Sequence, residues 1–183
     1  MIYIMYITCV RFVVKIYQNI LKLFDFYQNV WYIIYVDEID NEETKMKLIG
    51  GQKLRELGSD RHTDDLDYLI YDAADDRLFI HEPGRDIVNA ANHPLYAQIW
   101  ALDADSDQVS LRALLEMTAF TFVQHCENGQ WDKADAKEYD LKFLCRKMIE
   151  SGEEIDFSLT REFVSSGAAI EIEKIIRSVT DRK

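Results

Sequence analysis

The sequence predicts an α+β protein with short strands in its first half and helices in its second. Of its 183 residues, 48% are hydrophobic and 30% are charged, which is typical of a globular chain large enough to bury its own core. Short apolar runs bounded by turn residues occupy the region before residue 85. From residue 110 onward, apolar residues recur at intervals of three and four, which indicates helices.

The first half begins with a short apolar segment, Lys47–Ile49, that leads into two glycines. Gln52–Leu57 is expected to form a short helix that ends at Gly58. Asp65–Tyr71 and Arg77–His81 have the composition of strands. We therefore expect two strands in close succession after one short helix.

Turn residues mark the ends of both strands. Asp75-Asp76 lies between the two predicted strands, which favours a hairpin, and Pro83-Gly84 ends the second strand. The segment after Pro94 is expected to be a short helix or strand.

Three helical regions make up the second half. The first starts at Ser110, a suitable N-cap, and ends before Gly129. Its apolar stripe contains Leu111, Leu114, Leu115, Phe122 and Cys126. The second runs from about residue 132 to 149, and the third covers Ser158–Val179 with a break near Gly167.

Charge and cysteine content exclude some classes of protein. The net charge is −12, which argues against a broad surface that follows nucleic-acid phosphates but leaves room for a small basic pocket. Three cysteines are too few, and odd in number, for a disulfide framework. Reduced thiols in a cytoplasmic protein are therefore expected.

Residues 1–45 differ in composition from the rest. Residues 1–36 contain six of the ten tyrosines and carry a net charge of +2, so that the remaining chain carries −14. Three interpretations are open: an element that packs on the domain or on a partner, a translated upstream segment with Met46 as the natural start, or a membrane-associated helix. No charge-free apolar run is long enough for stable membrane insertion. We expect an N-terminal extension over residues 1–45, an α/β core over residues 46–108 and a helical part over residues 109–183.

Candidate chemistry is concentrated between residues 50 and 67. Asp65 and Asp67 lie two apart on a predicted strand, so their carboxylates share a face, and like charges this close favour a divalent cation such as Mg²⁺ between them. Gly50-Gly51 and Gly58-Ser59 allow backbone N–H groups to approach a phosphate, and Arg61 could neutralise its charge. The alternative is a glycine turn, a solvated loop and an ordinary edge strand.

The stretch GGQKLRELGSDRHTDDLDYLI resembles the first motif of nucleotidyltransferases of the AbiEii/MenT abortive-infection toxin type, within the DNA polymerase beta-like superfamily. Arg61, Thr63, Asp65 and Asp67 stand at matching places. The resemblance covers residues 46–72 and continues more weakly through residues 114–144. It implies a small mixed sheet with flanking helices, followed by a helical C-terminal part.

The resemblance also implies an activity and its site. It implies Mg²⁺-dependent transfer of a nucleotide from a nucleoside triphosphate to an acceptor hydroxyl on an RNA end or a protein, with an antitoxin protein as partner. Asp65 and Asp67 would hold the metal ion. Gly50, Gly51 and Ser59 would cradle phosphates, and Arg61 would offset charge.

Two positions of the helical half bear on this activity. Those toxins carry a lysine in a motif E-x-K-x-A, where this chain has Thr118, and an aspartate in a Tyr-Asp-Leu motif, which Asp140 retains. Both residues fall on apolar stripes and are expected to point inward. An inward Asp140 needs a partner, for which Arg61, a lysine, a metal ion or the Thr118 hydroxyl are candidates. Asp140 would act as a further carboxylate near the reacting hydroxyl. Loss of the lysine at Thr118 would weaken catalysis, which leaves a nucleotide-binding or partner-binding relative as the alternative.

Overall fold

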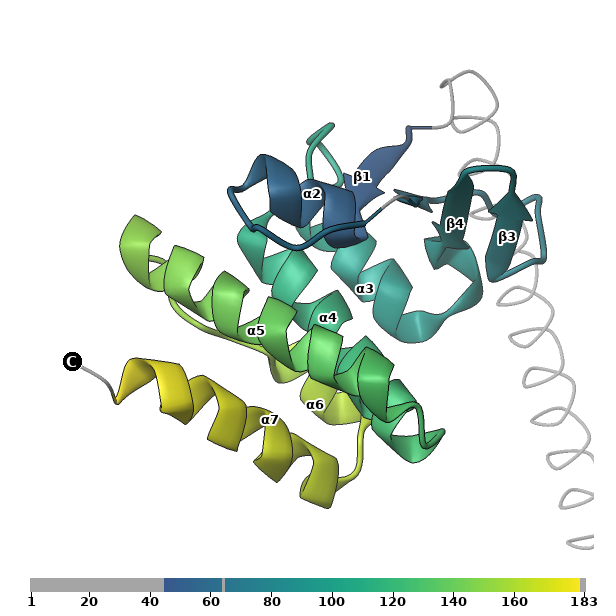
Figure 1. The fold of residues 1–183 in the computed structure, drawn as a ribbon. Helices are drawn as coiled ribbons and strands as arrows, with labels where there is room; N and C mark the ends of the chain where they lie inside the picture. The colour runs from purple at the N-terminus through teal and green to yellow at the C-terminus, as the bar shows by residue number, and fades with distance from the viewer. Residues whose placement is uncertain (1–44, 64, 182–183) are drawn as a thin grey trace, which may run out of the picture. The chain divides into compact units, whose positions relative to one another are not determined.

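A computed structural model describes residues 45–63 and 65–181, so the predictions for the segment before Lys45 lie outside the described residues. This part is α+β and mostly helical, as predicted, with one small mixed sheet (Figure 1). The strands are β1 (Lys47–Ile49), β2 (Leu66–Ile70), β3 (Phe79–Glu82) and β4 (Arg85–Asn89). The helices are α2 (Gly50–Glu56), the 3-10 turn η1 (Ala90–Asn92), α3 (Pro94–Leu102), α4 (Leu111–Glu127), α5 (Trp131–Ser151), α6 (Ser158–Phe163) and α7 (Ser166–Thr180).

The four strands are ordered β1-β2-β4-β3. β2 pairs antiparallel with β1 and parallel with β4, and β3 pairs antiparallel with β4. The predicted hairpin between Asp65–Tyr71 and Arg77–His81 is therefore wrong. The hairpin is instead β3–β4, which turns at Pro83-Gly84, and β4 was not predicted as a strand.

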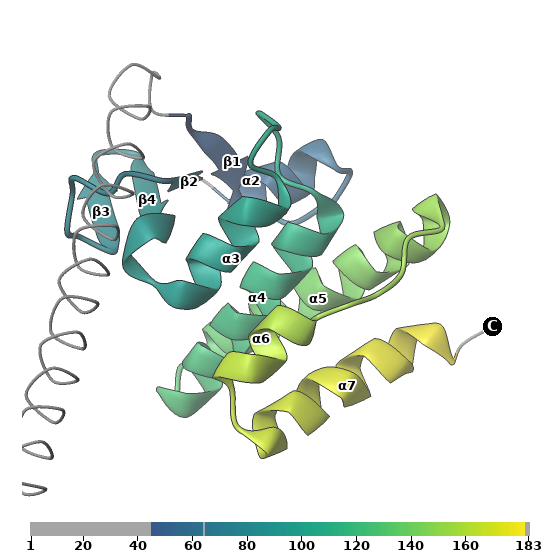
Figure 2. The same cartoon turned by 180° about the vertical axis from the view of Figure 1, so that it is seen from behind.

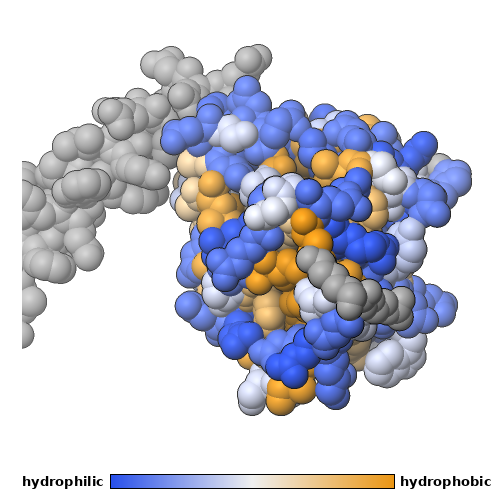
Figure 3. Space-filling view, turned by 90° about the vertical axis from the view of Figure 1, so that its left-hand side faces the viewer, coloured by the Kyte–Doolittle hydropathy of each residue, from blue (hydrophilic) through white to orange (hydrophobic). Residues whose placement is uncertain are grey.

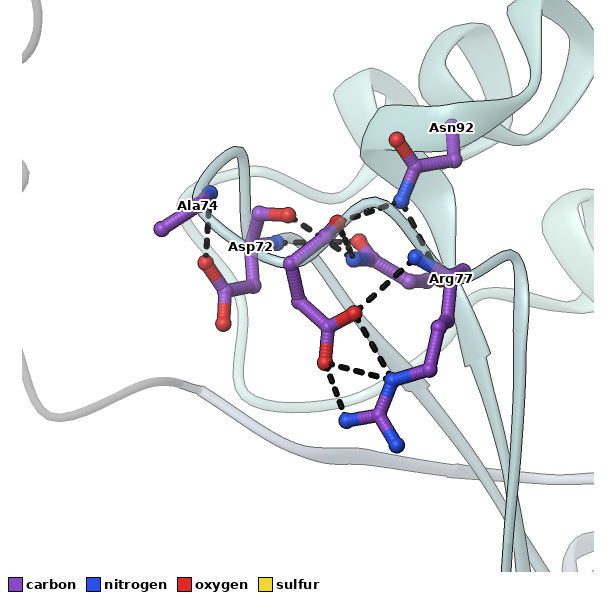
Figure 4. Close-up of polar contacts among 6 residues, drawn as sticks. Asp72, Ala74, Arg77 and Asn92 are labelled. Carbon is purple, nitrogen blue, oxygen red and sulfur yellow. Dashed lines mark hydrogen bonds and ion pairs between the residues drawn. The ribbon is translucent and has the colours of Figure 1, made fainter.

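The loop between β2 and β3, whose residues Asp72, Ala74 and Arg77 are labelled in Figure 4, is held by the buried side chain of Asn89 at the end of β4. Its Oδ1 accepts a hydrogen bond from the Asp72 N–H (3.0 Å), and its Nδ2 donates to the carbonyl oxygens of Asp72 (2.8 Å) and Asp75 (3.0 Å). Asn92 donates to the Asp75 carbonyl oxygen (2.6 Å). These bonds fix the loop beside the end of β4, so that β4 takes the place next to β2 and β3 forms an edge of the sheet.

Helices α4 and α5 form an antiparallel pair at the centre of the described part. Figures 1 and 2 show the sheet and α2 at one end, α7 at the other, and this pair between them. The Ser110 Oγ accepts a hydrogen bond from the Ala113 N–H (3.2 Å), which confirms the predicted N-cap of α4. The pair contributes much of the apolar core, including the fully buried side chains of Leu115, Leu141 and Leu144.

The last helical region is broken earlier than predicted. α6 ends at Phe163 and α7 begins at Ser166 with Ser165 as its N-cap, so Gly167 lies inside the first turn of α7. The Ser165 hydroxyl accepts a hydrogen bond from the Ala168 N–H (3.2 Å) and so caps the start of α7. This N-cap, and not Gly167, sets the boundary between the two helices.

The start of α6 is capped by a buried carboxylate from another helix. Glu116 of α4 is fully buried, and its two carboxylate oxygens accept hydrogen bonds from the backbone N–H groups of Leu159 (3.1 Å) and Thr160 (2.7 Å). The Thr160 hydroxyl donates in turn to the Glu116 carbonyl oxygen (2.8 Å).

Each helix of the described residues falls short of the length and apolar character needed to cross a bilayer.

Candidate functional site

A cleft of about 350 Å³ lies between the sheet and helices α4 and α5. One wall carries acidic side chains from β2 and β4, and the other carries polar side chains from α4 and one lysine from α5. Its polar lining consists of Asp67, His81, Asp86, Thr118, Thr121, Gln124, His125 and Lys137. Apolar residues, among them Phe79, Tyr96 and Met117, complete the walls.

The two parts of the glycine and aspartate motif meet at this cleft. Gly50 has a φ of +63°, and a Cβ at this position would lie only 1.9 Å from the Asp67 Oδ2. The backbone N–H of Gly51 lowers the pKa of the Asp67 carboxylate, in opposition to burial. Gly50 is therefore required both for its left-handed backbone and for the close approach of Asp67. Both Gly50 and Asp67 line the cleft.

Asp67 is the acidic centre of the site. Burial raises the pKa of Asp67, and the nearby carboxylates of Asp86 and Asp65 raise it further, whereas Lys137 and the Gly51 N–H lower it. Asp86 pairs with Asp67 in the parallel register of β2 and β4, so the two side chains share a face. Asp65 is exposed and directly precedes β2. These three acidic residues supply oxygen donors of the kind that Mg²⁺ prefers.

The donors lie apart in the structure. Among the described residues, no group of three His, Cys, Asp or Glu side chains is arranged closely enough to hold a metal ion together. Asp86 is also engaged elsewhere, because its Oδ1 lies 2.7 Å from the His81 Nδ1. A metal ion would therefore draw exposed Asp65 and Asp86 toward Asp67.

Thr118 is buried and lines the cleft, as its predicted inward orientation requires. Ser59 is buried in the turn after α2, where its Oγ accepts a hydrogen bond from the Arg61 N–H (3.3 Å). Ser59 does not line the cleft. Its hydroxyl instead holds the backbone of the turn that leads to Arg61.

Asp140 is fully buried at the centre of a charged cluster. Its Oδ2 forms an ion pair with Arg61 and lies 3.7 Å from the Lys137 Nζ, while its Oδ1 has no hydrogen-bond partner within the described chain. Two of the candidate partners, Arg61 and a lysine, therefore offset the charge of Asp140 on the side of its Oδ2. Burial raises the pKa of Asp140, and the charges of Lys137 and Arg61 oppose that shift.

The cleft brings together some of the site residues expected from the sequence. Gly50, Asp67 and Thr118 line it, and Lys137 connects it to the pair of Asp140 and Arg61. The other expected site residues do not line the cleft: Gly51, Ser59, Arg61, Asp65 and Asp140. Sequence reasoning missed Lys137 and Asp86. Lys137 precedes Asp140 by three residues, a spacing that places both on one helix face and could have revealed the pair. Asp86 was missed because β4 was not predicted.

A second cavity, of about 630 Å³, lies among α4, α5 and α7. Its walls include Phe122, Val123, Trp131 and Ile175 together with surface glutamates and lysines. Figure 3 views the side of the molecule where α5 and α7 end and shows apolar side chains in a hollow surrounded by hydrophilic ones. None of the residues singled out in the sequence for chemistry lines this cavity, so the smaller cleft is the candidate site.

Searches of protein-family models, curated proteins and solved structures found no match for this chain.

Proposed function

We propose that this protein is a Mg²⁺-dependent nucleotidyltransferase that uses the cleft between the sheet and helices α4 and α5. The proposal is carried by the close approach of Gly50 to the Asp67 carboxylate, which brings together the two parts of the motif that carries the family resemblance. In the proposed reaction, an acceptor hydroxyl oxygen forms a bond to the α-phosphorus of a nucleoside triphosphate. The bond to the leaving pyrophosphate breaks, and the hydroxyl proton passes to solvent.

Asp67 and Asp65 would hold the metal ion, with Asp86 as a third carboxylate. Support comes from the shared face of Asp67 and Asp86. Burial is the main cause of the raised pKa of Asp67, and Asp86 and Asp65 add a repulsion that a cation would relieve. When bound, Mg²⁺ would neutralise negative charge on the triphosphate and on the reacting oxygen. The Gly50-Gly51 backbone would keep the Asp67 carboxylate in place, which replaces the phosphate-cradling role expected for these glycines.

The acceptor and the setting follow from the resemblance. We propose an RNA end or a protein hydroxyl as acceptor, in the cytoplasm, within a toxin–antitoxin or phage-defence system whose antitoxin protein binds this chain. A net charge of −12 disfavours binding along the phosphates of a long nucleic acid. It leaves room for an acceptor that places only its end in the cleft.

The test is incorporation of labelled nucleotide from each of the four triphosphates into total RNA and total protein, with Mg²⁺ or Mn²⁺ present. Asp67→Asn keeps the side-chain volume but removes a metal-ligand charge, so incorporation should fall by at least about 100-fold. Asp105→Asn, in the exposed loop after α3, is the matched control and should keep wild-type incorporation. Equal incorporation by Asp67→Asn and wild type would refute the assignment of the site.

A non-catalytic nucleotide-binding protein is the second candidate. It is favoured by Thr118, which lines the cleft at the position where the resemblance implies a lysine. Binding of a nucleoside triphosphate without incorporation of any of the four nucleotides, with either metal ion, would establish this second function in place of the first.

A further inference from the structure

Lys137 has a distinctive place in the cleft. Among the described residues that line it, Lys137 is the only lysine or arginine. It reaches the cleft from α5, whereas the lysine implied by the resemblance would come from residue 118 of α4. The Lys137 side chain is 19% exposed, so its charge lies mostly within the protein.

The ammonium group of Lys137 keeps hydrogen-bonding capacity for a ligand. Its Nζ lies 3.7 Å from the Asp140 Oδ2, which is longer than a direct N–H···O hydrogen bond of ordinary geometry. Arg61 already occupies that same carboxylate oxygen through its Nη1. An ammonium group has three donors, so Lys137 can donate into the cleft while Asp140 holds it from the protein side.

Arg61 is a poorer candidate for contact with a ligand in the cleft. Its guanidinium is bound to Asp140, and its side chain does not contribute to the cleft lining. The titratable groups around Lys137 are those of Asp140 on its own helix, Arg61 after α2, Asp67 on β2 and His125 on α4, whose pKa is lowered by burial. Only Lys137 among these cations both lines the cleft and lies within the field of Asp67.

We infer that Lys137 is the residue that binds the triphosphate, in place of the lysine absent from position 118, and that Asp140 is the residue that positions it. This inference rests on the proposed function, because it assumes a triphosphate in the cleft. Thr118 then marks a relocation of the cation from α4 to α5. The short threonine leaves the cleft free of a second ammonium group that would repel the first.

The test measures binding of a fluorescent nucleoside triphosphate and of inorganic tripolyphosphate, each with Mg²⁺, by the full chain. Lys137→Met removes the charge and keeps the stem, so both dissociation constants should rise roughly 10- to 100-fold, the range for a lost charge-assisted hydrogen bond. Lys137→Arg should restore most of the affinity. Lys133→Met, an exposed lysine one turn earlier on α5, is the matched control and should leave affinity unchanged.

Two further variants separate a binding role from a structural one. Lys137→Met with Thr118→Lys returns a cation to the same cleft from α4 and should regain triphosphate affinity, whereas Thr118→Lys alone should gain little. Asp140→Asn should weaken triphosphate binding in the wild-type background but have no further effect in the Lys137→Met background, because a residue that acts through Lys137 loses its effect once Lys137 is gone. Thermal unfolding of each variant shows whether it is folded.

The outcomes distinguish this inference from the proposed function. Nucleotide incorporation by wild type together with unchanged triphosphate affinity in folded Lys137→Met would overturn the inference and leave the function standing. Loss of triphosphate affinity in Lys137→Met, without incorporation by wild type, would support the inference and overturn catalysis. Absence of triphosphate binding by wild type would overturn both.

Discussion

Replacing Gly50 by alanine tests whether the contact between α2 and Asp67 is as close as the structure shows. An alanine at Gly50 meets two obstacles, a φ of +63° and a Cβ position 1.9 Å from the Asp67 Oδ2. The left-handed backbone costs an alanine about 1–2 kcal/mol. Forcing Asp67 aside adds about 1–3 kcal/mol, as overpacking of a filled site does. We therefore expect Gly50→Ala to lower the free energy of unfolding by about 2–5 kcal/mol.

Gly129→Ala is the matched control. Gly129 has a nearly identical φ of +67°, but a Cβ there would have no heavy atom within 4 Å. Its substitution should cost only the backbone part, about 1–2 kcal/mol. Urea unfolding followed by circular dichroism gives both free energies, and the difference between them isolates the contact with Asp67.

A second substitution identifies the residue in the way. Asp67→Ala removes the carboxylate oxygen that the new Cβ would strike, so Gly50→Ala should cost less in that background than in the wild type. Equal destabilisation by Gly50→Ala and Gly129→Ala, or an unchanged cost after Asp67→Ala, would refute the close approach on which the proposed site depends.

Two other predictions concern stability and reactivity. Asn89→Ala deletes a buried side chain that donates hydrogen bonds to the loop between β2 and β3, so the free energy of unfolding in urea should fall by about 2–4 kcal/mol. Asn92→Ala, at an exposed position, should lower it by less than about 1 kcal/mol. Similar losses at both positions would contradict the role of Asn89. Burial raises the pKa of the Cys145 thiol to about 11, so only about one molecule in a thousand carries the thiolate at pH 8, and iodoacetamide should label Cys145 slowly until urea unfolds the chain. Because the folded pKa is the higher one, this thiol favours the folded state below its unfolded pKa and loses that contribution as the pH rises through 11; rapid native-state labelling, followed by mass spectrometry, would contradict its burial.

The helical half of the fold was predictable because its signals are local. Ser110 bonds to the Ala113 N–H three residues later, and the apolar spacing around it needs no distant partner. The order of the strands was not predictable in this way. β4 begins with the polar pair Arg85-Asp86 and pairs with β2 across some twenty residues of chain, through a loop fixed by Asn89. The predicted hairpin was wrong for that reason, because it paired two strands that follow one another in the sequence.

In the candidate site too, the residues that belong to one local motif were predicted and those brought in from distant segments were missed. Gly50 and Asp67 were predicted to belong to one site because one sequence motif contains both. The structure brings them together because Ile49, directly before Gly50, pairs with Asp67 in the sheet. Lys137 was missed as a cleft residue because its approach to Asp67 brings together segments that lie far apart in the sequence, although its spacing from Asp140 indicates their pair. Asp140 was correctly expected to be buried and paired, yet it does not line the cleft itself.

The cap that Glu116 provides for α6 has a consequence for the motions of the molecule. The amide protons of Leu159 and Thr160 are held by a carboxylate on α4, so they exchange with solvent only when α6 separates from α4. Two residues further along α4, Thr118 forms part of the cleft wall. Separation of α6 from α4 would therefore leave the buried Glu116 carboxylate without its two amide partners, at a point of α4 within one turn of the cleft wall.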